Sequence, residues 1–190
     1  MKSNQLKLNM VTTNNKPRQA ANSSDHFDWY TPRLIIDLVK QVFGGTIDLD
    51  PASADYPQTW IEANTYYTEQ TDGLAQKWEA DNVFLNPPYG QNVTDKWIYK
   101  FIEEYQADHF KEGIILINTN NCTKWYEDLV PHCNLLCLKG SPRISFIDSR
   151  TKQPGRQPAA HNSFFYFNKD GNTAKFESVF KHIGNVLKPV

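Results

Sequence analysis

The sequence predicts an α/β fold with a mostly parallel sheet, helices on both faces and an antiparallel hairpin at one edge. Short strand-like runs alternate with segments of helical periodicity, which is typical of parallel strands joined by helices. The run 113–118 is continuously apolar, as expected for a strand covered on both faces. The last two strand-like runs are joined without an intervening helix, so we expect them to pair antiparallel at the sheet edge.

The predicted helices place apolar residues at the spacing of one helix face. The first helix covers 32–43, with Thr31 as its N-cap, Pro32 as its first helical residue and Gly44 and Gly45 as its stop. The other predicted helices are 94–105, 124–130 and 174–187, and the predicted strands are 46–50, 83–85, 113–118, 134–138, 143–147 and 163–168.

Length and composition predict one folded domain over residues 25–190. Residues 1–24 are polar, with four basic residues and no acid, and are predicted to form a disordered basic tail. No apolar run is long enough to cross a bilayer and no signal-peptide pattern is present, so we expect a cytoplasmic protein without a membrane partner. The three cysteines lack a CxxC pair, which argues against a disulfide scaffold and a zinc site, and no metal is predicted.

Charge is nearly balanced overall, with 20 Lys and Arg against 21 Asp and Glu, which excludes a protein that coats nucleic acid by charge alone. One internal stretch departs from this balance. Between positions 139 and 156 a single acid, Asp148, is accompanied by five cations: Lys139, Arg143, Arg150, Lys152 and Arg156. Such a stretch is either ordinary solvated surface or a contact for a polyanion, and the sequence leaves both open.

The strongest chemical signal is Asn86-Pro87-Pro88-Tyr89-Gly90, which directly follows a predicted buried strand. A rigid turn would explain the two prolines but neither Asn86 nor Tyr89. Ligands of α/β sheets bind at the carboxyl ends of the strands, where this loop is expected to lie.

The residue types of this loop suit chemistry on a planar amine. The exocyclic amine of a nucleobase is a poor nucleophile because its lone pair is delocalised into the ring. The Asn86 side-chain oxygen and a backbone carbonyl held between the two prolines can accept its N–H bonds, and proline contributes no competing N–H. Tyr89 offers a ring on which an extruded base can stack.

Several blocks in this order resemble the phage-type DNA adenine-N(6) methyltransferase (Dam) family. The resemblance covers about residues 27 to 180. The blocks are Asp28-Trp29-Tyr30-Thr31-Pro32, Ile47-Asp48-Leu49-Asp50-Pro51-Ala52-Ser53, Tyr66-Tyr67-Thr68, Asp72-Gly73-Leu74 with Trp78, Leu85 to Gly90, Leu116-Ile117-Asn118 with Trp125, Arg143-Ile144-Ser145-Phe146 and Phe164-Phe165-Tyr166-Phe167. It implies a Rossmann-like methyltransferase fold, S-adenosylmethionine as cofactor, double-stranded DNA as partner, and catalytic roles for Asn86, Pro87, Pro88 and Tyr89.

The resemblance also implies which residues bind the cofactor. Asp48 and Asp50 are expected to pair its ammonium or organise the loop, although strand-end capping explains Asp48 equally well. The helix that follows Thr31 would favour its carboxylate, and Asp72 its ribose or adenine. The full set is Trp29, Tyr30, Thr31, Pro32, Asp48, Asp50, Pro51, Ala52, Ser53 and Asp72, with Trp29, Tyr66, Tyr67 and Trp78 as candidates for stacking on adenine.

Two departures from the family pattern qualify these expectations. The usual Gly-x-Gly after the Asp-Pro is replaced by Ser53-Ala54-Asp55-Tyr56. Asp50 and Asn86 are only 36 positions apart, which leaves room for a short helix and strand, so the nucleotide-binding half is predicted to be compressed.

DNA contacts are expected from short loops, namely the one after Tyr89 and the basic hairpin with Lys139, Arg143, Arg150, Lys152 and Arg156. The resemblance places the protein in a bacterial host cell, encoded by a phage or prophage. Its oligomeric state is left open between a monomer and a weak dimer. Two other functions remain: methylation of an RNA base or a protein glutamine amide, and an inactive methyltransferase fold that binds DNA or a host factor.

Overall fold

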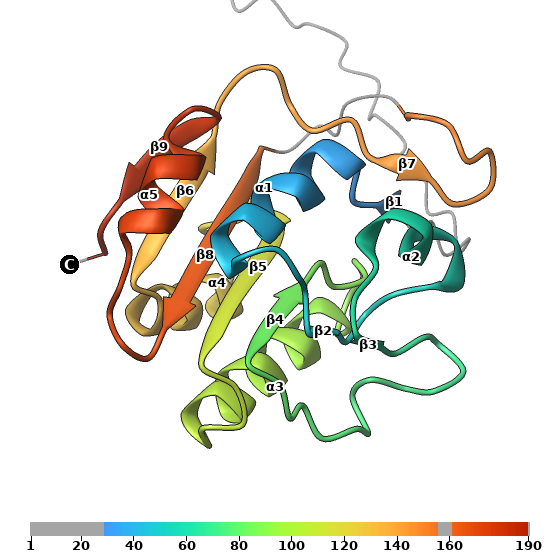
Figure 1. Cartoon of the computed structure of the whole chain (residues 1–190), viewed down its shortest axis with the longest axis horizontal. Coiled ribbons are helices and arrows are strands. Elements are labelled where there is room, and N and C mark those ends of the chain that lie inside the picture. Colours follow the sequence, from blue (N-terminus) through green and yellow to red (C-terminus); the bar gives the residue numbers. More distant parts are fainter. Residues whose placement is uncertain (1–28, 156–160, 190) are drawn as a thin grey trace, which may run out of the picture.

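The computed structural model describes residues 29–155 and 161–189. The predicted basic tail 1–24 and Arg156 lie outside the described residues. Within them the chain forms a seven-stranded sheet with the order β3-β2-β4-β5-β8-β6-β9 and a two-stranded sheet of β1 and β7 (Figure 1).

The elements follow one another along the chain with short connections. The strands are β1 Trp29–Tyr30, β2 Leu49–Asp50, β3 Thr65–Tyr66, β4 Asn82–Leu85, β5 Glu112–Asn118, β6 Leu135–Lys139, β7 Ile147–Asp148, β8 Asn162–Asn168 and β9 Gly184–Leu187. The helices are α1 Arg33–Phe43, α2 Asp55–Ile61, α3 Thr94–Gln106, α4 Lys124–Leu129 and α5 Ala174–Phe180, with a 3-10 turn at Val130–His132.

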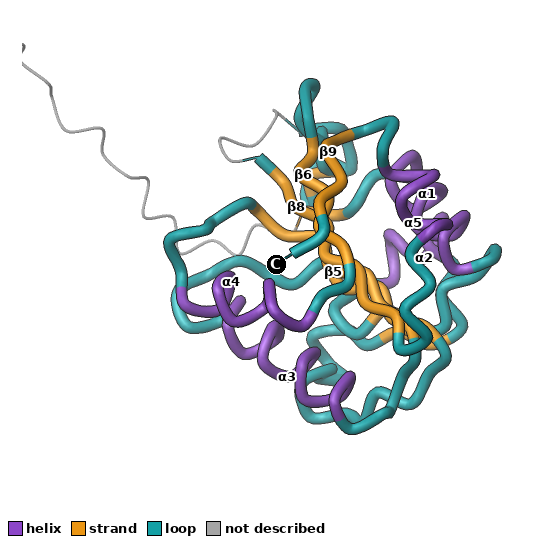
Figure 2. The backbone as a smooth tube through the Cα atoms, turned by 90° about the vertical axis from the view of Figure 1, so that its left-hand side faces the viewer, coloured by secondary structure: helices purple, strands orange, loops and turns teal. Residues whose placement is uncertain are grey.

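The large sheet is covered by helices on both faces. Figure 2 shows α1, α2 and α5 on one side and α3 and α4 on the other. The central strand β5 serves both layers, because Ile114 and Leu116 join the core under α1 and α5 while Ile115 and Ile117 join the core under α3 and α4. The predicted continuous apolar strand covered on both faces is therefore confirmed.

The carboxyl ends of β2 and β4 form a topological switch point. Both strands are parallel to each other, and β2 continues through α2 to β3 on one side while β4 continues through α3 to β5 on the other. The helices α2 and α3 pack on opposite faces, so the two connections diverge at the strand ends, which is the position of the ligand-binding crevice in open α/β sheets. The loops after Asp50 and Leu85 both begin at this crevice.

The parallel arrangement is confirmed for one half of the sheet only. The strands β3, β2, β4 and β5 are parallel to their neighbours, whereas β8 runs antiparallel to both β5 and β6. The expected short helix and strand between Asp50 and Asn86 are present as α2 and β3.

The predicted edge hairpin of 143–147 with 163–168 is wrong. Residues 163–167 are buried, so β8 takes an interior position between β5 and β6, where both of its aromatic faces are covered. Ile147–Asp148 instead pairs with Trp29–Tyr30 outside the large sheet.

The final predicted helix is also too long, because α5 ends at Phe180 and the chain then forms the edge strand β9. Strand β9 pairs antiparallel with β6. A Cβ at Gly184 would lie 2.3 Å from the Leu138 carbonyl oxygen, so glycine permits this close pairing.

The start of α1 differs by one residue from the prediction. Pro32 is the N-cap and Arg33 the first helical residue, and no side chain caps the helix. The Thr31 hydroxyl instead accepts a hydrogen bond from the Asn86 side chain. Within the described residues, no helix is both long and apolar enough to cross a membrane.

Candidate active site

Asn86 directly follows β4, and its side-chain amide is held by the segment before α1. Its Nδ2 donates to the Trp29 carbonyl at 3.2 Å and to the Thr31 Oγ1 at 3.2 Å. Both acceptors lie more than 50 positions away along the chain. The Asn86 Oδ1 is buried and has no hydrogen-bond partner. This orientation leaves an acceptor at the crevice for a donor from a ligand.

The rest of the turn is fixed at two points. The Thr94 hydroxyl donates to the Pro88 carbonyl at 3.0 Å, which ties the loop to the first residue of α3. The backbone N–H of Asn118 donates to the Tyr89 Oη at 3.0 Å. Burial of that hydroxyl raises the pKa of Tyr89, whereas 42% of the whole side chain remains exposed. The Tyr89 ring is thus anchored at its tip and remains accessible.

Strand β2 ends with a buried acid, Asp50, which is 3% exposed. Desolvation raises the pKa of its carboxyl to about 6, against hydrogen bonds from Ser53, the Ala52 backbone and Gln58 that lower it. Gln58 Nε2 donates to the Asp50 Oδ2 at 3.1 Å and to the Ser53 Oγ at 2.8 Å. These donors are neutral, so a cation at this place would stabilise the charged carboxylate.

Asp48 lies at the opposite end of the same strands. Its carboxylate accepts from the Asn82 backbone N–H at 3.2 Å and from the Asn64 side-chain amide at 2.8 Å. Asn82 is the first residue of β4, and its Oδ1 in turn accepts from the Asp48 N–H at 3.0 Å. Asp48 therefore lies away from the carboxyl ends of the strands. Its contacts with Asn82 join the amino ends of β2 and β4.

The segment with Asp72 and Gly73 packs against the loop after β2. A Cβ at Gly73 would lie 2.0 Å from the Pro51 carbonyl oxygen, so only glycine allows this approach. Asp72 is exposed in a turn, where its Oδ1 accepts from the Leu74 N–H at 3.2 Å. The turn explains the Asp-Gly pair, and the Gly73 contact also brings Asp72 to the predicted cofactor loop.

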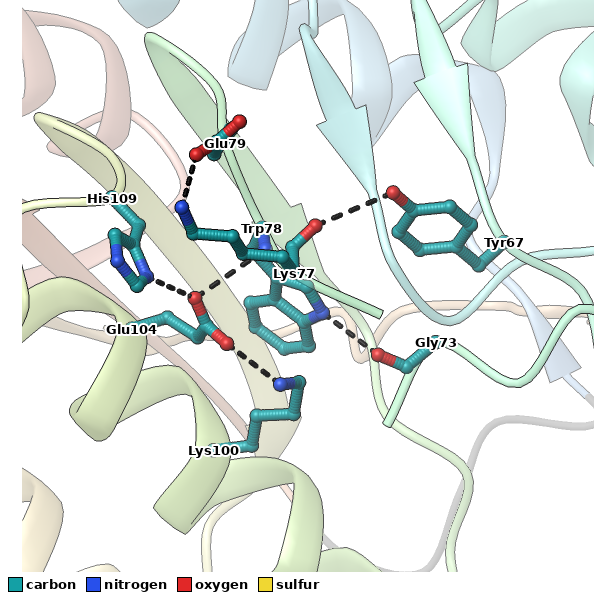
Figure 3. A network of polar contacts seen from close by, with 8 residues as sticks. All are labelled: Tyr67, Gly73, Lys77, Trp78, Glu79, Lys100, Glu104 and His109. Carbon is teal, nitrogen blue, oxygen red and sulfur yellow. Dashed lines mark hydrogen bonds and ion pairs between the residues drawn. The ribbon is translucent and has the colours of Figure 1, made fainter. Parts of the chain in front are cut away.

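A network of polar contacts around the buried Trp78 holds the Asp72-Gly73 segment in place (Figure 3). Trp78 donates from Nε1 to the Gly73 carbonyl at 2.8 Å and from its backbone N–H to the Glu104 Oε2 at 3.3 Å. Burial raises the pKa of Glu104, but hydrogen bonds from Lys100 and His109 outweigh it and lower the pKa below its usual value. Of the four aromatic residues named as candidates for stacking on adenine, Trp78 is fully buried and belongs to the core.

Trp29 and Tyr30 connect the Asn86 region to the basic segment. They form β1, which pairs antiparallel with β7. A Cβ at Gly155 would lie 2.1 Å from the Trp29 ring, so the backbone at 155 packs closely on that ring. Lys152 Nζ lies 5.0 Å from the centre of the Tyr30 ring and 4.4 Å from that of Tyr56. In Figure 1 the chain after β6 crosses to this side of the molecule.

The predicted DNA-binding cations differ in their surroundings. Arg150 pairs with Asp148 at 3.2 Å and lowers the pKa of that carboxyl to about 2. The Lys139 ammonium, at the carboxyl end of β6, donates to the Gly140 and Pro142 carbonyls at 2.9 and 2.7 Å, and desolvation lowers its pKa. Arg143 is half-buried in the same segment.

Sequence reasoning missed several side chains at this edge of the sheet. Besides Asn86, the described residues contain two buried side-chain oxygens without a hydrogen-bond partner, Asp95 Oδ1 and Asn162 Oδ1. Asp95 lies in the first turn of α3, and Asn162 pairs across the sheet with Asn118, the last residue of β5. All three oxygens therefore lie at the carboxyl edge. No local pattern marks these residues, because their burial depends on the packing of distant segments.

Comparison with known proteins identifies the family of this chain. The sequence matches the family described as DNA N-6-adenine-methyltransferase (Dam) over residues 19–182. It is also 24% identical over 128 residues to the DNA N-6-adenine-methyltransferase of Haemophilus phage HP1 (strain HP1c1), an alignment that covers 67% of this chain and 70% of the phage protein. Because the family match spans most of the chain and every site residue described above, the protein belongs to the DNA N-6-adenine-methyltransferase (Dam) family.

Proposed function

We propose that this protein transfers a methyl group from S-adenosylmethionine to the exocyclic N6 amine of adenine in double-stranded DNA, with the target base flipped out of the helix. Family membership supports DNA adenine methylation as the general activity. The observation that carries the finer proposal is the buried Asn86 Oδ1, which has no partner at the crevice between β2 and β4. We further propose that residues 25–190 form one Rossmann-like methyltransferase domain.

The acceptor side of the reaction needs groups that accept both N–H bonds of the N6 amine. The Asn86 Oδ1 is one of these acceptors, because the Nδ2 of the same side chain already donates to Trp29 and Thr31. The Pro87 carbonyl, which stands between the two proline rings, is the other. The Pro88 carbonyl already accepts from Thr94, so it serves to fix the turn. Accepting both N–H bonds concentrates electron density on N6 as it becomes tetrahedral.

An adenine that reaches these acceptors must leave the base stack. The exposed Tyr89 ring, held at its hydroxyl by Asn118, offers a preorganised surface on which the extruded base can stack. Because the ring is fixed before the base arrives, stacking costs little side-chain entropy.

The residues at the loop after β2 fit the amino acid end of S-adenosylmethionine. The buried Asp50 carboxylate, with neutral donors around it, suits the ammonium group. Thr31 and Pro32 lead into α1, whose N-terminal end favours a carboxylate. Trp60 of α2 donates from Nε1 to the Thr31 carbonyl at 3.0 Å, so the helix after the Asp50 loop is tied to the start of α1. The Gly73 contact keeps Asp72 beside Pro51, where it can reach the ribose.

When bound, S-adenosylmethionine would supply a methyl group activated by its positively charged sulfur; the N6–methyl bond would form as the methyl–sulfur bond breaks, the positive charge would pass to N6, and N6 would then lose one proton to solvent. The groups that hold Asn86 are a backbone carbonyl and a hydroxyl, both neutral. The catalytic loop therefore acts by positioning and polarising the amine rather than by general-base catalysis.

DNA is proposed to lie along the carboxyl edge of the sheet. Lys139 ends β6 there, Arg150 and Lys152 follow β7, and Lys152 lies beside Tyr30. With Arg143 and Arg156 they supply contacts to phosphates, which position the duplex without reading its sequence.

The deciding experiment is transfer of a tritiated methyl group to adenine-containing duplex DNA by the wild type and by Asn86→Ala. We expect transfer by the wild type and a loss of about a hundredfold or more in the variant, comparable to removal of an essential polarising group. RNA and glutamine-containing protein serve as parallel acceptors. Transfer that survives unchanged in Asn86→Ala would refute the mechanism, and labelling of RNA or protein but not DNA would refute the substrate.

A further inference from the structure

A pocket lies beside the catalytic loop and shares Tyr89 with the proposed stacking site of the target base. It measures about 400 Å³, within the range of roughly 300–1,000 Å³ typical of ligand pockets. Its walls come from residues 89–92 after β4, from Thr94 and Asp95 of α3, and from side chains between 118 and 125 after β5. Tyr89 is the member of the Asn-Pro-Pro-Tyr motif that lines it, so the pocket adjoins the site of the target base.

Most of the lining residues are polar, and one of them carries a negative charge. Among the described residues that line the pocket there is no Lys, Arg or His, and Asp95 is the charged side chain. A phosphate would be repelled by that carboxylate and would find no cation. Asn118, Asn120 and Thr123 add hydrogen-bonding groups, and Trp125 adds a second ring to that of Tyr89. These features suit a planar, polar and uncharged occupant.

Asp95 determines which polar edge that occupant must present. Its Oδ1 is buried without a hydrogen-bond partner, and an ionised carboxylate can only accept hydrogen bonds. Asn118 is less adaptable, because its Oδ1 already accepts from the Asn162 side chain at 3.0 Å. A base edge with an acceptor facing Asp95 would be repelled, whereas an edge that offers an N–H donor alone would satisfy it.

In the major groove, guanine, adenine and thymine each present at least one acceptor, while cytosine presents only its N4 amino donor. We propose that the pocket beside Tyr89 binds a cytosine next to the target adenine, with Asp95 accepting from its N4 amine, so that the enzyme selects its DNA sequence there. This inference rests on the proposed function, since it assigns the sequence context of the same DNA substrate.

The test uses a library of duplexes in which a central adenine is flanked by random bases. The wild type, Asp95→Asn, Asn120→Ala and Asp37→Asn are each incubated with the library, and bound and methylated molecules are sequenced separately. Asp37 is exposed on α1, so Asp37→Asn makes the same chemical change away from the pocket. Thermal melting confirms that each variant is folded.

We expect the wild type to prefer cytosine at one flanking position. Asp95→Asn should reduce that preference about fivefold to a hundredfold, the discrimination of one good base contact. Asn120→Ala should weaken it in the same direction, and Asp37→Asn should keep it. A uniform change across all sequences cancels in these ratios, so loss of charge alone does not imitate the effect.

The inference is overturned if the wild type shows no cytosine preference in the bound fraction, or if Asp95→Asn leaves that preference intact. Failure of the proposed function gives a different result, because the methylated fraction of the wild type would then be empty. In that case the bound fraction still reports whether the pocket reads cytosine.

Discussion

The Asn86 Nδ2 donates to the Thr31 Oγ1 at 3.2 Å, which joins the catalytic loop to the segment before α1. An amide can rotate to exchange its oxygen and nitrogen, and only one orientation leaves the oxygen for the amine of adenine. The Trp29 carbonyl can only accept, so it requires the nitrogen to face it, and the Thr31 hydroxyl accepts from the same nitrogen; together they hold the orientation that the proposed reaction needs. Thr31 thus acts as a positioning residue for Asn86.

We predict that Thr31→Val lowers kcat about tenfold to a hundredfold while KM for DNA changes little, because a misaligned amide weakens the transition state more than the encounter. Thr31→Ser keeps the hydroxyl and should restore most of the rate. Single-turnover methyl transfer at saturating DNA measures this. Equal loss in the valine and serine variants would show that the methyl group, and not the hydroxyl, is what matters.

The affinity for S-adenosylmethionine should depend on pH through Asp50. The pKa of its carboxyl without a cation is about 6, so below that pH a proton competes with the ammonium of the cofactor. Binding should be nearly constant above pH 7 and should weaken towards tenfold per pH unit below 6. Calorimetric titration from pH 5 to 8 measures it. Asp50→Asn should bind weakly with little pH dependence, and an Asp50→Asn variant that keeps the wild-type profile would assign the titration to another group.

The two acids of the Asp48–Asp50 block should affect stability in opposite ways. The raised pKa of Asp50 means that the folded state holds its proton more tightly than the unfolded state between about pH 4 and 6, so stability falls as pH rises through that window. At pH 7 this costs up to about 3 kcal/mol, which Asp50→Asn should recover in part. Asp48→Ala should instead lower the unfolding free energy by about 1–3 kcal/mol, because it leaves the Asn82 backbone N–H without its acceptor.

These changes are measured by urea unfolding at pH 7, alongside calorimetric titration of the folded variants. Asp48→Ala should keep its affinity for S-adenosylmethionine, since Asp48 lies at the amino end of the strands. A large loss of cofactor affinity in folded Asp48→Ala would contradict that placement.

Gly73→Ala should disturb the cofactor loop. A Cβ there would lie 2.0 Å from the Pro51 carbonyl oxygen, so the backbone must move. We expect a loss of about 1–3 kcal/mol in stability and a clear loss of cofactor affinity, measured by thermal melting and calorimetry. In Gly140→Ala, a matched control, the Cβ would meet the Ile183 carbonyl at 3.6 Å, an ordinary contact, and binding should be unchanged.

Arg150→Gln should reduce the salt dependence of DNA binding. If Arg150 contacts a phosphate, the slope of log K against log salt should decrease in magnitude by about one. Lys169→Gln removes the same charge at the opposite edge of the sheet, next to the last residue of β8, and should leave the slope unchanged. Fluorescence polarisation across a range of salt concentrations distinguishes them, and equal slopes for wild type and Arg150→Gln would remove Arg150 from the interface.

Local patterns predicted much of this fold. The helical spacing that begins after Thr31 and at Thr94 corresponds to α1 and α3, and the apolar run 113–118 corresponds to the central strand β5. The Asn86 turn also lies where the sequence placed it, directly after a buried strand. These features depend on periodicity and turn chemistry, which short segments carry by themselves.

The predictions were wrong where the pairing of strands that are distant in the sequence decides the structure. Residues 163–168 are strand-like in any position, but their burial on both faces moves them from the edge to the middle of the sheet. Gly184 continues a helical pattern in the sequence, yet its close approach to Leu138 makes it the start of β9.

The sequence by itself determined which residues are proposed to carry the chemistry, because an amide, two prolines and a tyrosine after a strand suit a planar amine in any such fold. Only the tertiary structure decided how they are arranged. It showed that Thr31 holds Asn86, that Asp50 and Asp48 lie at opposite ends of β2, and that the Asp95 Oδ1 is buried without a hydrogen-bond partner in the segment that lines the pocket beside Tyr89. Each of these depends on contacts between segments distant in the chain, whose formation depends on packing of the whole sheet and not on local sequence.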